Sequence, residues 1–173
     1  VAGHLKGIGF DVMVYDPYVP PETIRQLGLT PVELDELLRN ADFVSMHSLV
    51  TDETRNLLNE ERIALMKPSA YVVNTSRGAV IDEDALVNAL QNKTIAGAAL
   101  DVLDQEPPPT DHPLLQLDNA IITPHAAFYS TTAIAELAEK AARHVAQSLQ
   151  QQVPDNIVNP TVLNQDNLRL LRI

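Results

Sequence analysis

The chain has 173 residues, 45% of them hydrophobic, which is enough for one domain of ordinary size with a buried core. Its formal net charge of −11, from 23 acidic and 12 basic residues, disfavours binding to the phosphates of nucleic acid. The chain contains no cysteine and no apolar stretch of the roughly 18 residues that a membrane-spanning helix needs, so we expect a cytoplasmic protein without disulfides or thiolate chemistry.

Helical and strand patterns alternate from the start of the chain to Thr123. Helical spacing or capping residues predict Val1–Ile8 as the end of a helix, Pro21–Leu27, a helix after the capping box Thr30-Pro31-Val32-Glu33, Asn59–Met66 and Asp82–Leu90. Apolar runs predict buried strands at Asp11–Tyr15, Asp42–Met46, Tyr71–Asn74, Gly97–Val102 and Ala120–Thr123. This alternation predicts a parallel α/β fold, in which ligands bind at the carboxyl ends of the strands.

The composition changes after Pro124. From Ser130 to about Gln152 the chain is rich in alanine, and apolar residues recur at helical spacing. This pattern predicts one long amphipathic helix. Val153-Pro154-Asp155 then ends it, and we expect Asn156–Leu163 to be irregular.

Asp16 follows the first predicted strand. An acid at this place is typical of a dinucleotide-binding fold, where it holds the adenosine ribose hydroxyls and favours NAD over NADP. The alternative is a turn or helix-capping aspartate. The glycine fingerprint of such folds lies about 20 residues before the acid. Only 15 residues precede Asp16, which is too few to contain this fingerprint. We therefore expect the first strand and the glycine-rich phosphate loop to be missing from the chain.

Three side chains of complementary chemistry follow the last three predicted strands. Arg77 can grip a carboxylate through two parallel hydrogen bonds. Glu106 lies in an acidic loop stiffened by three prolines, and His125 suits proton transfer near neutral pH. Taken separately, each residue has a non-catalytic interpretation: a surface arginine, an acidic surface loop or a structural histidine. Together they supply an anion-binding group, an orienting carboxylate and an acid/base. The spacing of the histidines in the sequence does not indicate a metal site.

The motifs that contain these residues resemble the D-isomer-specific 2-hydroxyacid dehydrogenases, and the similarity extends over nearly the whole chain. They are Asn74-Thr75-Ser76-Arg77-Gly78-Ala79-Val80-Ile81-Asp82, Gly97-Ala98-Ala99-Leu100-Asp101-Val102 through Glu106-Pro107, and Thr123-Pro124-His125. The resemblance implies a Rossmann-like doubly wound parallel sheet, truncated at its N-terminus, over residues 1–129. Residues 130–173 would be the crossover helix and the C-terminal part of the substrate lobe.

The resemblance also implies an NAD-dependent oxidoreductase that acts on D-2-hydroxy acids or 2-keto acids. Arg77 would anchor the substrate, His125 would be the general acid/base and Glu106 its partner. The implied assembly is a homodimer through the cofactor domain. The cofactor contacts that the resemblance implies are Asp16, Ser48, Leu49, Thr54, Thr75, Ser76, Arg77, Asp101 and His125.

Two departures from the family's usual pattern keep alternatives open. Ser48-Leu49-Val50 replaces a stretch in which many relatives have proline, and His125-Ala126-Ala127-Phe128-Tyr129-Ser130 is closer to the branch of the C-terminal binding protein corepressors. An NAD(H)-sensing interaction module is therefore one alternative. The other is an inactive fragment, because NAD would lose its pyrophosphate anchor without the phosphate loop.

Overall fold

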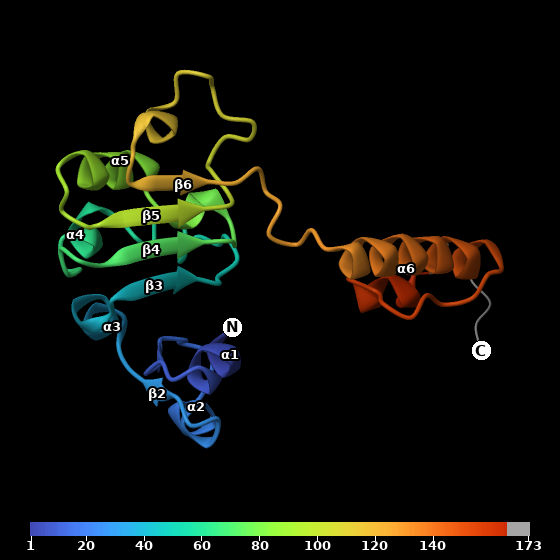
Figure 1. The fold of residues 1–173 in the computed structure, drawn as a ribbon. Coiled ribbons are helices and arrows are strands. Elements are labelled where there is room, and N and C mark those ends of the chain that lie inside the picture. The colour runs from blue at the N-terminus through green and yellow to red at the C-terminus, as the bar shows by residue number, and fades with distance from the viewer. Residues whose placement is uncertain (166–173) are drawn as a thin grey trace. The chain divides into compact units, whose positions relative to one another are not determined.

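The computed structural model describes residues 1–165, which belong to two compact units (Figure 1). The first unit is Val1–Ala127, and the second begins at Phe128. The helices of the first unit are α1 (Ala2–Gly7), α2 (Pro21–Gln26), α3 (Leu34–Asn40), α4 (Glu60–Ile63) and α5 (Glu83–Gln91), with short 3-10 helices η1 (Gly78–Val80) and η2 (Pro113–Gln116). Its strands are β1 (Met13–Val14), β2 (Thr30–Pro31), β3 (Phe43–Met46), β4 (Tyr71–Asn74), β5 (Gly97–Leu100) and β6 (Ala120–Ile122).

Every strand pair in the described residues is parallel, which confirms the predicted α/β class. The strands form two sheets rather than one. The first has the order β1-β2. The second has the order β3-β4-β5-β6, which can be followed in Figure 1. Because β4, β5 and β6 are parallel neighbours, their carboxyl ends lie at the same edge of the second sheet. The segments after these ends carry Arg77, Glu106 and His125.

The predicted capping box at residues 30–33 is wrong. Thr30 and Pro31 form strand β2, which pairs with Met13 and Val14 of β1. The ladder uses the amides of Thr30 and Val32, so the missing N–H of Pro31 falls between two donors and costs no hydrogen bond. Helix α3 begins only at Leu34, and no side chain caps it.

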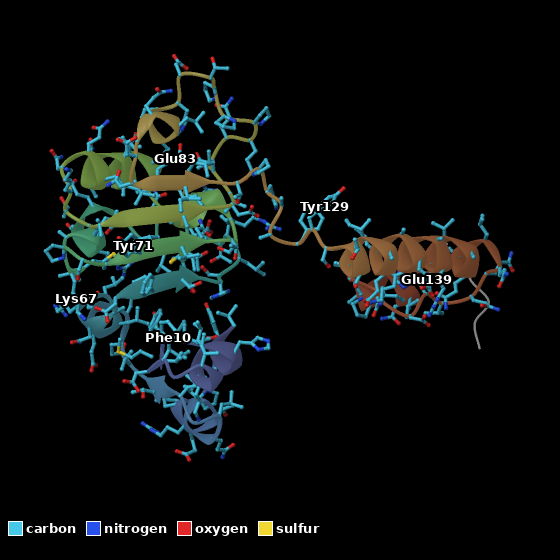
Figure 2. The ribbon with its side chains drawn as sticks, viewed as in Figure 1. Phe10, Lys67, Tyr71, Glu83, Tyr129 and Glu139 are labelled. Atoms are coloured by element: carbon cyan, nitrogen blue, oxygen red, sulfur yellow. The ribbon has the colours of Figure 1, made fainter. Side chains whose placement is uncertain are left out.

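The core of the first unit lies on one face of the second sheet. Val44, Val72 and Leu100 point to this face and are buried with residues of α3, α4 and α5. The other face exposes large apolar side chains. The rings of Phe43 and Tyr71 stack there at 5.5 Å, and Figure 2 labels Tyr71. Alternate residues of each strand point to opposite faces, so this pattern follows from the pleat.

The second unit contains α6 (Thr131–Leu149) and the 3-10 helix η3 (Pro160–Asn164). The Ser130 hydroxyl accepts the amide of Ala133 at 3.0 Å and caps the predicted long helix. The assignment of residues 130–173 to a substrate lobe stays a prediction, and residues 166–173 lie outside the described part. Among the described residues, no helix has the length and apolarity needed to cross a bilayer.

Candidate active site

The end of β4 is organised by a buried polar residue, Asn74, which is 1% exposed. Its Oδ1 accepts hydrogen bonds from the amide and the hydroxyl of Ser76, at 3.0 and 2.8 Å. Its Nδ2 donates to the carbonyl of Arg77 at 2.9 Å. These three bonds fold residues 74–77 into a turn that leaves the Arg77 side chain exposed at the end of the strand. We assigned Asn74 no role from the sequence, although a polar residue at the end of an apolar strand signals one.

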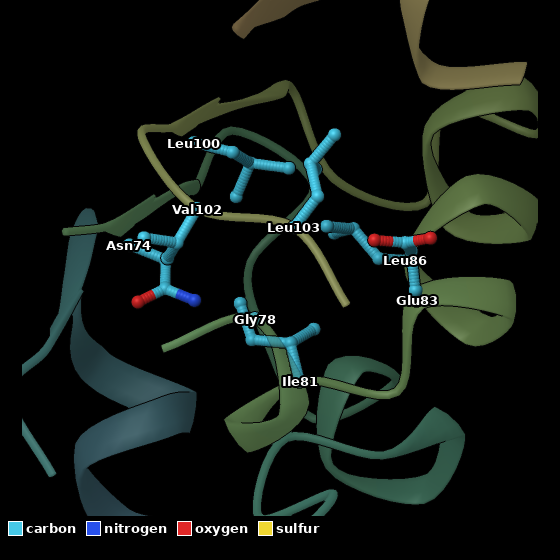
Figure 3. A pocket seen from close by; sticks show the side chains of 8 residues that line it. All are labelled: Asn74, Gly78, Ile81, Glu83, Leu86, Leu100, Val102 and Leu103. Carbon is cyan, nitrogen blue, oxygen red and sulfur yellow. The ribbon is translucent and has the colours of Figure 1, made fainter. Parts of the chain in front are cut away.

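Gly78 allows the loops after β4 and β5 to touch. A Cβ at this position would lie 2.1 Å from the carbonyl carbon and oxygen of Leu103 and 2.4 Å from the amide nitrogen of Asp104. These are backbone atoms, so a side chain here requires the second loop to move. Figure 3 shows Gly78 and Leu103 at the same small cavity. The close approach fixes the position of Arg77 relative to the loop that carries Glu106.

Asp101, at the end of β5, holds the turn after β6. Its carboxylate accepts hydrogen bonds from the backbone amides of Ala126 and Ala127, both at 2.8 Å, and from the hydroxyl of Thr123. Burial raises the pKa of this carboxyl, but the bonds from Thr123, Ala127 and Ala126 outweigh burial, so the pKa lies below its ordinary value. The carbonyl of Asp101 also accepts the amide of His125 at 2.9 Å. The carboxylate thus stays charged and keeps residues 123–127 in place.

His125 and Glu106 are joined by a direct hydrogen bond. Glu106 Oε2 lies 2.7 Å from His125 Nδ1, and Glu106 Oε1 accepts the amide of Leu103 at 3.0 Å. His125 has a φ of 51°, in the left-handed region that non-glycine residues seldom adopt. The hydrogen bonds made by Asp101 hold that conformation. Because Nδ1 faces the carboxylate, Nε2 is the other ring nitrogen of His125 at which a proton could be bound or released.

Glu106 and His125 line the same pocket as Arg77. A cavity of about 260 Å³ is lined by Val50, Arg77, Gly78, Ala79, Leu103, Asp104, Glu106 and His125. All of these residues belong to the first unit. The structure therefore brings together the three side chains that we selected as catalytic, at an open pocket large enough to admit a small organic acid.

The pair gives a testable pH dependence. The hydrogen bond to His125 is the main cause that holds the pKa of Glu106 below its ordinary value. A carboxyl with a lowered folded pKa stabilises the fold above its unfolded pKa, about 4.3, and this stabilisation is lost as pH falls through the folded pKa. We expect Glu106→Gln to remove that component. Denaturant unfolding at a series of pH values should show a smaller loss of stability on acidification for the variant than for the unmodified protein.

The matched control for this titration is Glu61→Gln, which makes the same change at an exposed carboxylate in the first turn of α4. It should leave the pH dependence unchanged. Equal pH dependences for Glu106→Gln and the unmodified protein would contradict the expectation.

The predicted cofactor contacts lie along the strand ends, beginning with Asp16 after β1. Asp16 is exposed and its Oδ1 accepts the amide of Tyr18 at 2.9 Å. The Tyr18 hydroxyl donates to Glu53, which connects this region with the loop after β3. In that loop the Thr54 hydroxyl donates to the carbonyl of Leu49 at 2.5 Å. The contacts of Asp16 and Thr54 with a cofactor stay predictions.

Ser48 carries a further signal in the same loop. Among the described residues, its Oγ is the buried side-chain polar atom that lacks a hydrogen-bond partner. A buried hydroxyl without a partner costs free energy, so such an atom points to a bound group that would complete it. Thr75, by contrast, is exposed at the end of β4, next to Ser76. Together with the acid after β1, these polar groups fit the donors and acceptors of a dinucleotide.

The parallel sheet, with polar groups at its strand ends, defines a Rossmann-like α/β ligand-binding domain. The family model for the "D-isomer specific 2-hydroxyacid dehydrogenase, NAD binding domain" matches residues 1–127. The chain belongs to this family, and its NAD-binding assignment follows from that membership.

Relatives and solved structures agree with this assignment. The chain is 42% identical over 163 residues to a glyoxylate reductase of Korarchaeum cryptofilum, covering 94% of this chain and 49% of that protein. It is 39% identical to a D-3-phosphoglycerate dehydrogenase of Methanocaldococcus jannaschii, covering 99% and 33%. A D-lactate dehydrogenase from Aquifex aeolicus, complexed with NAD and lactic acid, matches with a TM-score of 0.78 and 36% identity, covering 86% and 49%. The chain thus spans half or less of the length of these relatives.

Proposed function

We propose that the protein containing this chain is an NAD-dependent oxidoreductase that interconverts 2-keto acids and D-2-hydroxy acids. The observation that carries this proposal is the shared pocket. It combines a guanidinium at the end of β4 with a histidine–carboxylate pair whose Nδ1–Oε2 distance is 2.7 Å. A 2-keto acid presents a carboxylate and a carbonyl oxygen on neighbouring carbons, so it needs an anion grip beside a proton donor.

Each of the three side chains has one task in the proposed reduction. Arg77 binds the substrate carboxylate through paired N–H donors and orients the carbonyl. Bound NADH supplies the hydride to the carbonyl carbon. His125 donates the proton from Nε2 to the carbonyl oxygen, which becomes the hydroxyl of the product. Glu106 accepts the Nδ1–H, keeps the ring in the productive orientation and stabilises the charged imidazole before transfer.

The proposed cofactor contacts are those named from the sequence: Asp16 on the adenosine ribose, Asp101 near the nicotinamide amide, and the strand-end residues Ser48, Leu49, Thr54, Thr75 and Ser76. The unpartnered Ser48 hydroxyl supports the part played by the loop after β3. Residues 1–129 would bind the cofactor and residues 130–173 would contribute to the substrate lobe. A homodimer through the cofactor domain, as the family resemblance implies, completes the proposal.

The test is a substrate screen with the protein at its natural length. We expect consumption of NADH with glyoxylate, the substrate in the name of the Korarchaeum relative. In the oxidising direction we expect reduction of NAD with D-lactate but not with L-lactate. Tight binding of NADH without turnover of any 2-keto acid would favour the sensing module instead. Loss of both binding and turnover would overturn the proposal.

A further inference from the structure

A second histidine–carboxylate pair lies outside the proposed catalytic set. His112 Nε2 and Glu83 Oε1 are 2.8 Å apart, and their side chains are only 12% and 23% exposed. Among the contacts between carboxylates and basic side chains in the described residues this is the most buried one, because the side chains of the others are 37% exposed or more. A hydrogen bond to a carboxylate that is shielded from water competes less with solvent than one at the surface.

The hydrogen bonds of the pair define its protonation. His112 Nδ1 accepts the amide of Leu114 at 3.3 Å, so Nε2 carries the proton that faces Glu83. The other oxygen of Glu83, Oε2, accepts the amide of Asp104 at 3.1 Å. One carboxylate on the first residue of α5 therefore binds both ends of the segment 104–112.

The segment 104–112 contains Glu106. Glu106 Oε1 accepts the amide of Leu103, and Glu83 accepts the amide of the next residue, Asp104. Two carboxylates, one from the loop itself and one from α5, thus accept hydrogen bonds from consecutive backbone amides of the loop. Figure 3 shows that Glu83 of α5 and Leu103 line the same small cavity. A shift of the loop away from α5 would carry Glu106 away from His125.

We propose that Glu83 and His112 form a clamp that positions Glu106 against His125, and that both are positioning residues for the reaction. This inference rests on the proposed function for its kinetic consequence. The clamp acts through a loop that three consecutive prolines, Pro107 to Pro109, already stiffen, so fixing its two ends fixes the whole segment. Glu83 binds the amide of Asp104 in the loop that carries Glu106, so the main expected effect of the clamp is on proton transfer. A smaller effect reaches Arg77 through the contact of Gly78 with Leu103.

The first test variant is Glu83→Gln in the protein at its natural length. The amide keeps the shape of the side chain, but it has one acceptor oxygen for two donors, so one end of the loop is released. We expect kcat to fall about ten- to a hundredfold, as for a displaced catalytic group, with little change in KM for glyoxylate. The pH–rate profile should also change, because the position of the Glu106 carboxylate relative to the His125 ring changes.

The second variant, His112→Asn, keeps an acceptor for the Leu114 amide and removes only the link to Glu83. It should show a loss of the same kind, and the double variant should lose no more than the larger single loss. Glu61→Gln is the matched control. The NMR resonance of the His125 Nδ1 proton gives a readout that needs no turnover, and it should shift or broaden in both variants.

Folded variants with unchanged kcat, an unchanged pH–rate profile and an unchanged His125 resonance would overturn the clamp and leave the proposed function standing. Absence of turnover in the unmodified protein would overturn the proposed function. The His125 resonance would still decide whether Glu83 and His112 hold Glu106 in place.

Discussion

His125→Asn is expected to lower kcat for reduction of a 2-keto acid by about 10²- to 10⁴-fold, the usual contribution of a general acid. The expected loss follows from the proposed role of His125 as proton donor, with its Nδ1 held by Glu106 and its side chain at the pocket that Arg77 also lines. Asparagine is the suitable replacement because residue 125 has a φ of 51°, and asparagine tolerates the left-handed region better than most residues do. The fold of the turn at 123–127 should therefore survive the change.

Steady-state kinetics at saturating NADH and glyoxylate, together with a thermal unfolding scan, measure this effect. His4→Asn is the control, since His4 is exposed on α1. Retention of kcat within a few-fold of the unmodified protein by a folded His125→Asn variant would remove His125 from the proposed chemistry.

Arg77→Ala should act on substrate binding as well as on rate. The guanidinium is exposed at the end of β4 and lines the pocket, and its Nη1 donates a hydrogen bond to the carbonyl of Ser76 at 2.6 Å. Two charge-assisted hydrogen bonds, each worth about 1.5–3 kcal/mol, would be lost from the substrate carboxylate. We expect kcat/KM for glyoxylate to fall at least about a hundredfold, while the affinity for NADH changes far less.

Arg77→Lys separates charge from geometry, because lysine keeps the charge but offers no paired donors. It should recover only part of the loss. Arg39→Ala, at an exposed arginine on α3 paired with Asp35, is the control and should behave as the unmodified protein. A variant lacking Arg77 that keeps the unmodified KM for glyoxylate would show that the carboxylate binds elsewhere.

The sequence predicted the α/β class and the positions of the longer strands along the chain because a buried strand is a local, continuous apolar run. Tyr71–Asn74 has the predicted bounds for this reason. The strand Thr30–Pro31 was missed because two residues with a proline carry no strand pattern, and only pairing with β1 defines it. The division of the strands into two sheets was missed for the same reason, since pairing is a long-range property.

The candidate site likewise has residues that local sequence patterns reveal and residues that only long-range packing reveals. Arg77, Glu106 and His125 could be selected from their places after apolar runs, and the parallel order of β4, β5 and β6 makes their elements neighbours. Glu83 and His112 could not, because they lie 29 residues apart and neither belongs to a recognisable pattern. Their pairing depends on how the loop after β5 folds back onto α5.

The contact between Gly78 and Leu103 has a consequence for variation within the family. A side chain at position 78 collides with the backbone that leads to Glu106, so a single substitution there disturbs two loops together. Natural or engineered descendants of this chain can accept another residue at 78 only when the path or length of residues 103–106 changes as well. The two loops are therefore expected to evolve as one coupled unit.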